Sequence, residues 1–195
     1  ISITTAASLA ETDAATTHAF TVDSDADIQT IDGSTGLTNN FAIGVATSDD
    51  TATSGAAFVG DGDFTAATFT LSGWDGDSAG SVGGNSIAIN GDEIVELDES
   101  FDINLPADGA GGTNLAGMAA SITLTTPAAV EITNDDSATI SITTAASLLE
   151  TDAATTHAFT VDSDADIQTI DGSTGLTNDF AIGYATSDDT ATSGA

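Results

Sequence analysis

The sequence repeats itself with almost no change. Residues 1–56 return as residues 140–195, at an offset of 139 positions. Only three of these 56 positions differ: Ala10 becomes Leu149, Asn40 becomes Asp179 and Val45 becomes Tyr184. A long internal period means that the fold is built from units that follow one another along the chain. The sequence therefore predicts a tandem array, with one complete unit at residues 1–139 and the N-terminal part of the next, incomplete within this sequence, at residues 140–195.

The joint between the two units is short. It lies around residues 135–138 and contains neither Pro nor Gly, so we expect closely coupled neighbours rather than beads on a flexible linker. The chain begins inside an expected strand and stops just after an expected turn, so we expect it to continue. Three strands of the second unit would leave an apolar face and open strand edges. We expect the same chain, or another copy by strand exchange, to complete that unit.

Short alternating segments, separated by clusters of Gly, Asp, Asn and Ser, predict antiparallel β-strands. In the first unit we expect strands at residues 1–4, 17–22, 41–47, 67–71, 86–89, 101–105, 121–125 and 129–133. No long helical pattern interrupts them. Seven or eight strands in 139 residues predict an all-β fold, an antiparallel immunoglobulin-like β-sandwich. A unit of this size can bury its own core.

The charge of the chain is one-sided, with 31 Asp and Glu, no Lys or Arg, and a formal charge of -31. Without basic residues the chain cannot neutralise phosphates, which excludes direct nucleic-acid binding and polybasic adhesion to lipid. No apolar run is long enough for membrane insertion. The composition is 40% hydrophobic, which favours a folded protein over a disordered acidic chain. The repulsion among the carboxylates predicts a need for external cations.

Acidic residues gather beside the expected strands. The clusters are Glu11, Asp49–Asp50, Asp92–Glu93 with Glu96 and Glu99, and Asp135–Asp136. Adjacent carboxylates repel one another unless a cation bridges them. Oxygen ligands without thiols suit Ca²⁺, which takes six to eight oxygens, better than Mg²⁺, which retains waters. For each isolated pair, a solvated acidic loop is the alternative interpretation.

Three segments resemble, in the right order, motifs of Calx-beta domains. Residues 47–58 (TSDDTATSGAAF), 91–105 (GDEIVELDESFDINL) and 131–136 (EITNDD) are similar to the family's T-x-D-G-T-A-x-x-G-x-D-[YF], D-x-x-x-E-x-x-E-x-F-x-V-x-L and I-x-[DN]-D-D. The family is a Ca²⁺-binding β-sandwich found in sodium–calcium exchangers, integrin subunits and large bacterial surface proteins. The resemblance implies Ca²⁺ ligands at the pole facing the next unit, at Glu11, Asp49, Asp92, Glu96, Glu99, Asp135 and Asp136, with Glu150 and Asp188 as their counterparts in the second copy.

The sequence departs from the family pattern at three positions. Asp50 stands where the family usually has Gly, Ala57 stands where it often has Asp, and Gly91 replaces an acidic residue. The last change lowers the number of ions that we expect. A further acidic loop, residues 23–27 (DSDAD), begins like an EF-hand but lacks the required Gly and closing Glu. We reject an EF-hand there. Two interpretations of the loop remain, an accessory cation site and an acidic turn.

The near-identical units favour a structural function. We expect an extender repeat of a large extracellular surface protein, adhesin or fibre, with Ca²⁺ at the inter-repeat joints and neighbouring repeats as partners. The alternative is a ligand-binding adhesin module that grips a glycan or surface through Thr-rich loops or Trp74. An enzyme is not expected, because each unit has one His, at His18 or His157, and no G-x-S-x-G nucleophile elbow. A Ca²⁺ sensor on a transporter shares the fold, but the near-identical copy disfavours it.

Overall fold

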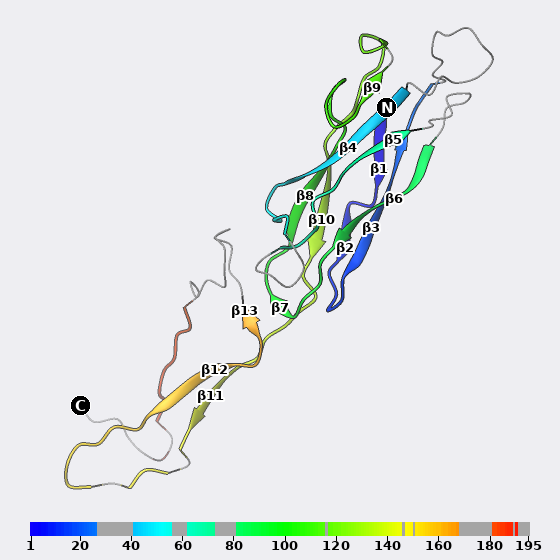
Figure 1. The fold of residues 1–195 in the computed structure, drawn as a ribbon. Helices are drawn as coiled ribbons and strands as arrows, with labels where there is room; N and C mark the ends of the chain where they lie inside the picture. The colour runs from blue at the N-terminus through cyan, green and yellow to red at the C-terminus, as the bar shows by residue number, and fades with distance from the viewer. Residues whose placement is uncertain are drawn as a thin grey trace.

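The computed structural model describes residues 1–26, 41–55, 62–72, 81–115, 117–145, 147–149, 151–167, 181–188 and 190. Every helix or strand assigned within these ranges is a β-strand (Figure 1). None of the described residues belongs to a helix that is long and apolar enough to cross a membrane.

The first unit contains two β-sheets. The smaller sheet has the strand order β1 (Ser2–Thr5), β3 (Thr16–Asp23) and β6 (Ser81–Ile89). The larger sheet has the order β2 (Ser8–Ala10), β10 (Ala128–Thr133), β8 (Glu99–Asn104), β4 (Phe41–Asp49) and β5 (Thr68–Ser72), and β9 (Asn114–Leu115) also pairs with β4. Neighbouring strands are antiparallel, except that β2 runs parallel to β10. The predicted all-β sandwich is confirmed, and the parallel pair arises because the first segment of the chain divides between the two sheets.

The core lies between the two sheets, because alternate residues of facing strands point inward. The buried residues of the strands are Phe20, Val22, Ile87 and Ile89 on the smaller sheet, and Ile43, Val45, Leu71, Phe101, Ile103, Leu115, Val130 and Ile132 on the larger one. Phe64 stacks on Phe101 with ring centroids 4.5 Å apart. His18 is buried as well, with its Nε2 2.5 Å from Thr5 Oγ1 and its ring edge-on to Phe101. His18 is therefore a core residue.

One expected strand, at residues 121–125, is not formed. Thr125 makes a single parallel bridge to Ser2, and the N-terminal ammonium of Ile1 donates a hydrogen bond to Thr123 O at 2.7 Å. The alternating sequence is typical of a strand. The edge that it meets is the very start of β1, so backbone pairing stops after one or two residues.

The second copy begins as the first one does. β11 (Ile140–Thr144) pairs with β12 (Phe159–Ser163), and Ile142 opposite Val161 repeats the pairing of Ile3 opposite Val22. Residues 181–188, which correspond to most of β4, are not assigned to a strand. In the first unit β4 is held by β5 and β8, and residues 140–195 contain no repeat counterpart of these two strands. The two units meet where β13 (Asp166–Ile167) pairs in parallel with β7 (Ile94–Val95).

Ile43 and Ile182 occupy the same repeat position in different environments, since Ile43 is fully buried and Ile182 is 44% exposed. We expect Ile43→Val to lower the free energy of unfolding by about 1 kcal/mol, because it removes a buried methylene and leaves a small cavity. Ile182→Val is the matched control, with an expected effect below about 0.5 kcal/mol. Chemical denaturation measures both variants. Equal effects would contradict the placement of the core.

Candidate metal centre

Three of the expected ligands meet at the end of the first unit that faces the second. Glu11 follows β2, Asp92 lies between β6 and β7, and Glu96 follows β7. One ligand oxygen from each lies within 4.8 Å of the others, and we call these three residues the buried group. Glu11 is only 2% exposed, and its backbone N–H donates to Thr133 O at 2.9 Å. This bond fixes the end of β2 beside β10 and places the Glu11 carboxylate inside the group.

Burial and mutual repulsion raise the pKa values of the buried group. Burial, followed by the charges of Asp92 and Asp63, raises the pKa of Glu11 to about 8. Burial, followed by the charges of Asp63 and Glu11, raises the pKa of Glu96 to about 9. The sequence has no Lys or Arg that could offset this repulsion. At neutral pH the group therefore has to hold protons or bind a cation.

Asp63, between Gly62 and Phe64, borders the buried group, since its charge acts on both Glu11 and Glu96. Its side chain is 6% exposed, and its Oδ2 accepts a hydrogen bond from Thr53 N at 2.6 Å. Burial raises its pKa, and a hydrogen bond with the side chain of the expected ligand Glu99 opposes that rise.

A second group of carboxylates lies at the joint between the units. Asp13, Asp135 and Asp136 each bring an oxygen within 4.8 Å of the others, and we call them the joint group. Asp135 and Asp136 were expected, whereas Asp13 was not, although it stands close to Glu11 in the sequence. The Oδ2 atom of Asp136 is buried and has no hydrogen-bond partner among the described residues. Burial, followed by the charge of Asp135, raises the pKa of Asp136.

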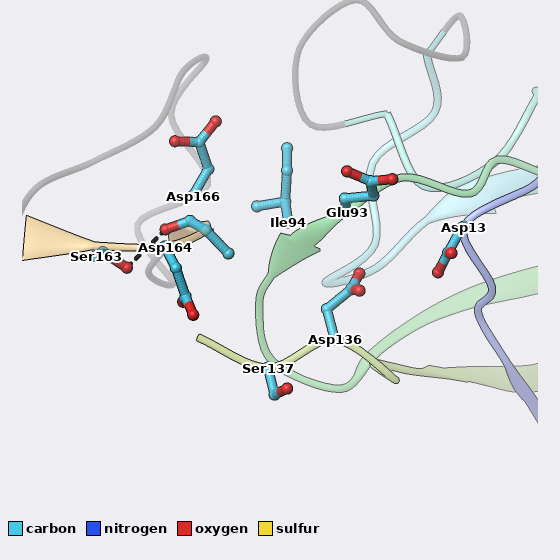
Figure 2. A pocket seen from close by; sticks show the side chains of 9 residues that line it. Asp13, Glu93, Ile94, Asp136, Ser137, Ser163, Asp164 and Asp166 are labelled. Carbon is cyan, nitrogen blue, oxygen red and sulfur yellow. Dashed lines mark hydrogen bonds between the residues drawn. The ribbon is translucent and has the colours of Figure 1, made fainter. Parts of the chain in front are cut away.

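The joint group borders a cleft of about 620 Å³ between the units (Figure 2). Its acidic lining comes from both units: Asp13, Glu93 and Asp136 from the first, Asp164 and Asp166 from the second. Asp164 and Asp166 belong to the second copy of the acidic loop 23–27. Asp164 Oδ1 accepts a hydrogen bond from Thr139 N at 2.5 Å, which lowers the pKa of Asp164. The loop therefore brings acidic side chains of the second unit to the joint.

The remaining expected ligands lie elsewhere. Asp49 Oδ1 accepts a hydrogen bond from Ser54 N at 3.1 Å, in the turn after β4, and Asp49 belongs to neither group within the described ranges. Asp188 is exposed and likewise belongs to neither group. Glu150 lies outside the described residues, as does Trp74. A ligand role for each of these carboxylates stays a prediction.

Gly91 explains one departure from the family pattern. A Cβ atom at this position would lie 1.8 Å from Thr12 O and 2.7 Å from the carbonyl carbon of Ala14. The loop that carries Asp13 therefore crosses directly over Gly91, and an acidic side chain has no room there.

We expect Gly91→Ala to displace that loop, because backbone atoms cannot yield as a flexible side chain does. The free energy of unfolding should fall by about 1–3 kcal/mol, and Ca²⁺ binding at the joint group should weaken at least tenfold. Gly183→Ala is the control, since its Cβ would have no atom within 4 Å. Denaturation and Ca²⁺ titration test both variants. A Gly91→Ala protein that behaves like the control would contradict the described packing.

The two groups have the donor chemistry of a hard divalent cation. Each supplies three carboxylates, and carboxylates that bind through one or two oxygens can provide most of the six to eight ligands of Ca²⁺. Glu11 and the Asp136 Oδ2 atom, which has no partner among the described residues, are buried, whereas Asp13 and Asp135 are exposed. The residues therefore fit Ca²⁺.

No protein-family model matches the sequence, and no curated protein matches it either. The matching solved structures include CBD12 of CALX1.1 (22% identity, TM-score 0.41) and CBD12 from CALX1.2 (19%, 0.41). Each of these matches covers 66% of this chain and 41% of the other, so the chain spans about two fifths of their length. The apo-form Calx CBD1 domain matches with 18% identity and a TM-score of 0.39, over 69% of this chain and 97% of that one. The structural neighbours of this chain are calcium-binding domains of the Calx-beta type.

Proposed function

We propose that this chain is an extender repeat of a large extracellular surface protein, in which Ca²⁺ stabilises each unit and stiffens the joint to the next. One observation carries the proposal. Glu11 is 2% exposed beside Asp92 and Glu96, in a chain that has no Lys or Arg. Burying charge without a counter-charge costs several kcal/mol, and a bound cation removes most of that cost.

Ca²⁺ is the cation that the ligands support best. The groups contain only oxygen donors, which disfavours softer metals that prefer thiolate or imidazole. Mg²⁺ usually keeps several of its waters and uses one or two carboxylates, whereas Ca²⁺ accepts crowded and irregular oxygen sets. We place the repeat outside the cell as part of the same proposal, because the millimolar Ca²⁺ found there would occupy sites with dissociation constants of about 10⁻⁴–10⁻³ M, the range of extracellular Ca²⁺ modules.

The joint supports a mechanical role. The backbone N–H of Thr139 donates a hydrogen bond to Asp164 Oδ1 at 2.5 Å. The backbone N–H of Asp164 donates one in return to Thr139 O at 3.2 Å. β13 adds to β7 across the same joint. A cation on the joint group would hold Asp13 and Asp136 together beside the acidic loop of the second unit. Ca²⁺ would then reduce the bending between neighbouring repeats, which would be its partners along the fibre.

The absence of cysteine makes the stiffness directly measurable with spin labels. Ala129→Cys on β10 and Ser141→Cys on β11 place one label on each side of the joint, at exposed positions. Double electron–electron resonance measures the distance between the two labels. We expect the distribution of this distance to be broad in EDTA and narrow in millimolar Ca²⁺. The control pair Ala129→Cys with Ala19→Cys lies within the first unit and should stay narrow while that unit is folded. An inter-unit distribution that Ca²⁺ leaves broad would refute the stiffening role.

A further inference from the structure

One of the three differences between the copies falls in the core. Val45 on β4 is fully buried and lies opposite Phe69 of β5. Its counterpart Tyr184 is 67% exposed and meets Phe159 edge-on, with ring centroids 5.0 Å apart. The second pair, Ala10 and Leu149, is exposed in both copies, and the third, at positions 40 and 179, lies outside the described residues. Among the described differences, Val45 against Tyr184 alone changes a buried position.

Apart from Tyr184, the second copy presents the apolar face that the first copy buries. Val161 and Ile182 are 40% and 44% exposed, whereas their counterparts Val22 and Ile43 are fully buried. In the first unit the covering strands β5, β6 and β8 come from residues 57–139, which we call the body. The face of residues 140–195 therefore matches a surface that exists in this chain, on the body, where residues 1–56 already occupy it.

Residues 140–195 cannot easily reach the body of their own chain. Ile1 lies beside Thr123, at the opposite end of β10 from the joint (Figure 1). To take that place, Ile140 would have to return along β10 over about 26 Å. The linker after Thr133 reaches at most about 25 Å when fully extended, with nothing left for the turns at both ends. Among the described residues, the body that residues 140–195 can reach is therefore that of a second copy of the chain.

We propose that Tyr184 prevents strand exchange between copies of this chain. With valine at this position, residues 140–195 of one copy would make the same described core contacts on the body of another as residues 1–56 make there. Tyrosine instead brings a larger side chain and a hydroxyl into a closed layer. Overpacking of this kind and a buried hydroxyl without a partner lower the affinity of the exchanged pairing by roughly tenfold to a hundredfold. The difference protects near-identical neighbours, which otherwise misassemble by swapping.

The protein concentration decides whether strand exchange between copies can be detected. Residues 1–56 are tethered to their own body, so a segment from another chain competes against an effective concentration in the millimolar range. With equal affinities, exchange is small at about 10 μM protein and substantial at about 1 mM. With tyrosine at position 184, we expect exchange to stay small at both protein concentrations.

The test compares Tyr184→Val with the wild-type chain. Both are unfolded in denaturant and refolded in millimolar Ca²⁺ at about 10 μM and about 1 mM, with circular dichroism to check folding. Light scattering after size exclusion then gives the fraction of oligomers. We expect a wild-type chain that stays monomeric and a Tyr184→Val chain with at least about tenfold more oligomer at the higher concentration. The substitution lies at an exposed position, so it leaves the first unit intact.

Two further variants separate the causes. Tyr184→Phe keeps the bulk but removes the hydroxyl, so it should form less oligomer than Tyr184→Val and no less than the wild type. Tyr184→Val with Val161→Asp places a charge where the counterpart Val22 is fully buried, and should return the chain to a monomer. The proposal fails if Tyr184→Val is as monomeric as the wild type, if the wild type is equally oligomeric, or if the oligomers survive Val161→Asp.

Discussion

Millimolar Ca²⁺ should raise the melting temperature of the metal-free chain by on the order of 10 °C. The buried group and the joint group each hold three carboxylates, so we expect at least two ions to bind to the folded chain and not to the unfolded one. Two ions, each at about a tenfold excess over its dissociation constant, add about 3 kcal/mol to the free energy of unfolding. Differential scanning calorimetry in EDTA, Ca²⁺ and Mg²⁺ measures the shift, and we expect Mg²⁺ to produce much less of it.

Neutralising one buried carboxylate should change the melting temperature in opposite directions without and with Ca²⁺. In EDTA, Glu96→Gln should raise the melting temperature, because burial and the charges of Asp63 and Glu11 raise the pKa of Glu96 to about 9, so that folding at neutral pH has to protonate Glu96 but not Gln. In Ca²⁺ the same variant should lose most of its stabilisation, because a ligand is gone. Glu131→Gln is the control, since Glu131 is exposed and lies in neither group; it should change neither value. A Glu96→Gln chain that is destabilised equally in both conditions would show that Glu96 is only a packing residue.

The pH dependence of the metal-free chain has the second largest expected effect. Glu11 and Glu96 have folded-state pKa values of about 8 and about 9, against 4.5 for an ordinary Glu carboxyl. Between these limits the folded state binds more protons than the unfolded state, so its stability falls as the pH rises. Each group contributes at most about 1.4 kcal/mol per pH unit, and screening by solvent reduces the share of the partly exposed Glu96.

The interval from pH 7 to pH 9 isolates this effect. Burial lowers the pKa of His18, so its contribution is lost as the pH falls through about 6.5 and is constant above pH 7. We expect the melting temperature in EDTA to fall steadily from pH 7 to pH 9. The doubly substituted Glu11→Gln, Glu96→Gln chain should show a flat profile. Saturating Ca²⁺ should also flatten it, because the metal displaces the protons. A flat profile for the unsubstituted chain in EDTA would contradict the burial of these carboxylates.

The sequence predicted most strands of the first unit because their apolar residues alternate. Ile43 with Val45, and Phe101 with Ile103, lie on buried faces as expected. Residues 121–125 alternate equally well but form no strand, because the edge of β1 that they meet is too short. The parallel pairing of β2 with β10 depends on how the first segment divides between two sheets, and no local pattern records that division.

The candidate metal centre could be predicted only in part from the sequence. The resemblance to the family implied Glu11, Asp92 and Glu96 as ligands, and the ends of β2, β6 and β7 bring these residues together. Asp63 and Asp13 were missed because each enters its group through long-range packing. Asp63 is carried inward beside Phe64, and the loop that holds Asp13 crosses over Gly91. Whether a carboxylate is buried depends on such contacts between segments, which spacing along the chain does not reveal.

Titration of the metal-free chain with Ca²⁺ by isothermal calorimetry tests the central claim most directly. We predict at least two ions per chain, with dissociation constants of about 10⁻⁵–10⁻³ M. Glu96→Gln should abolish or weaken the binding of one ion, and Asp136→Asn should do the same for another. Glu131→Gln should leave the binding of both ions unchanged. The account would be contradicted by a titration without saturable binding, or by binding that both variants leave unaltered.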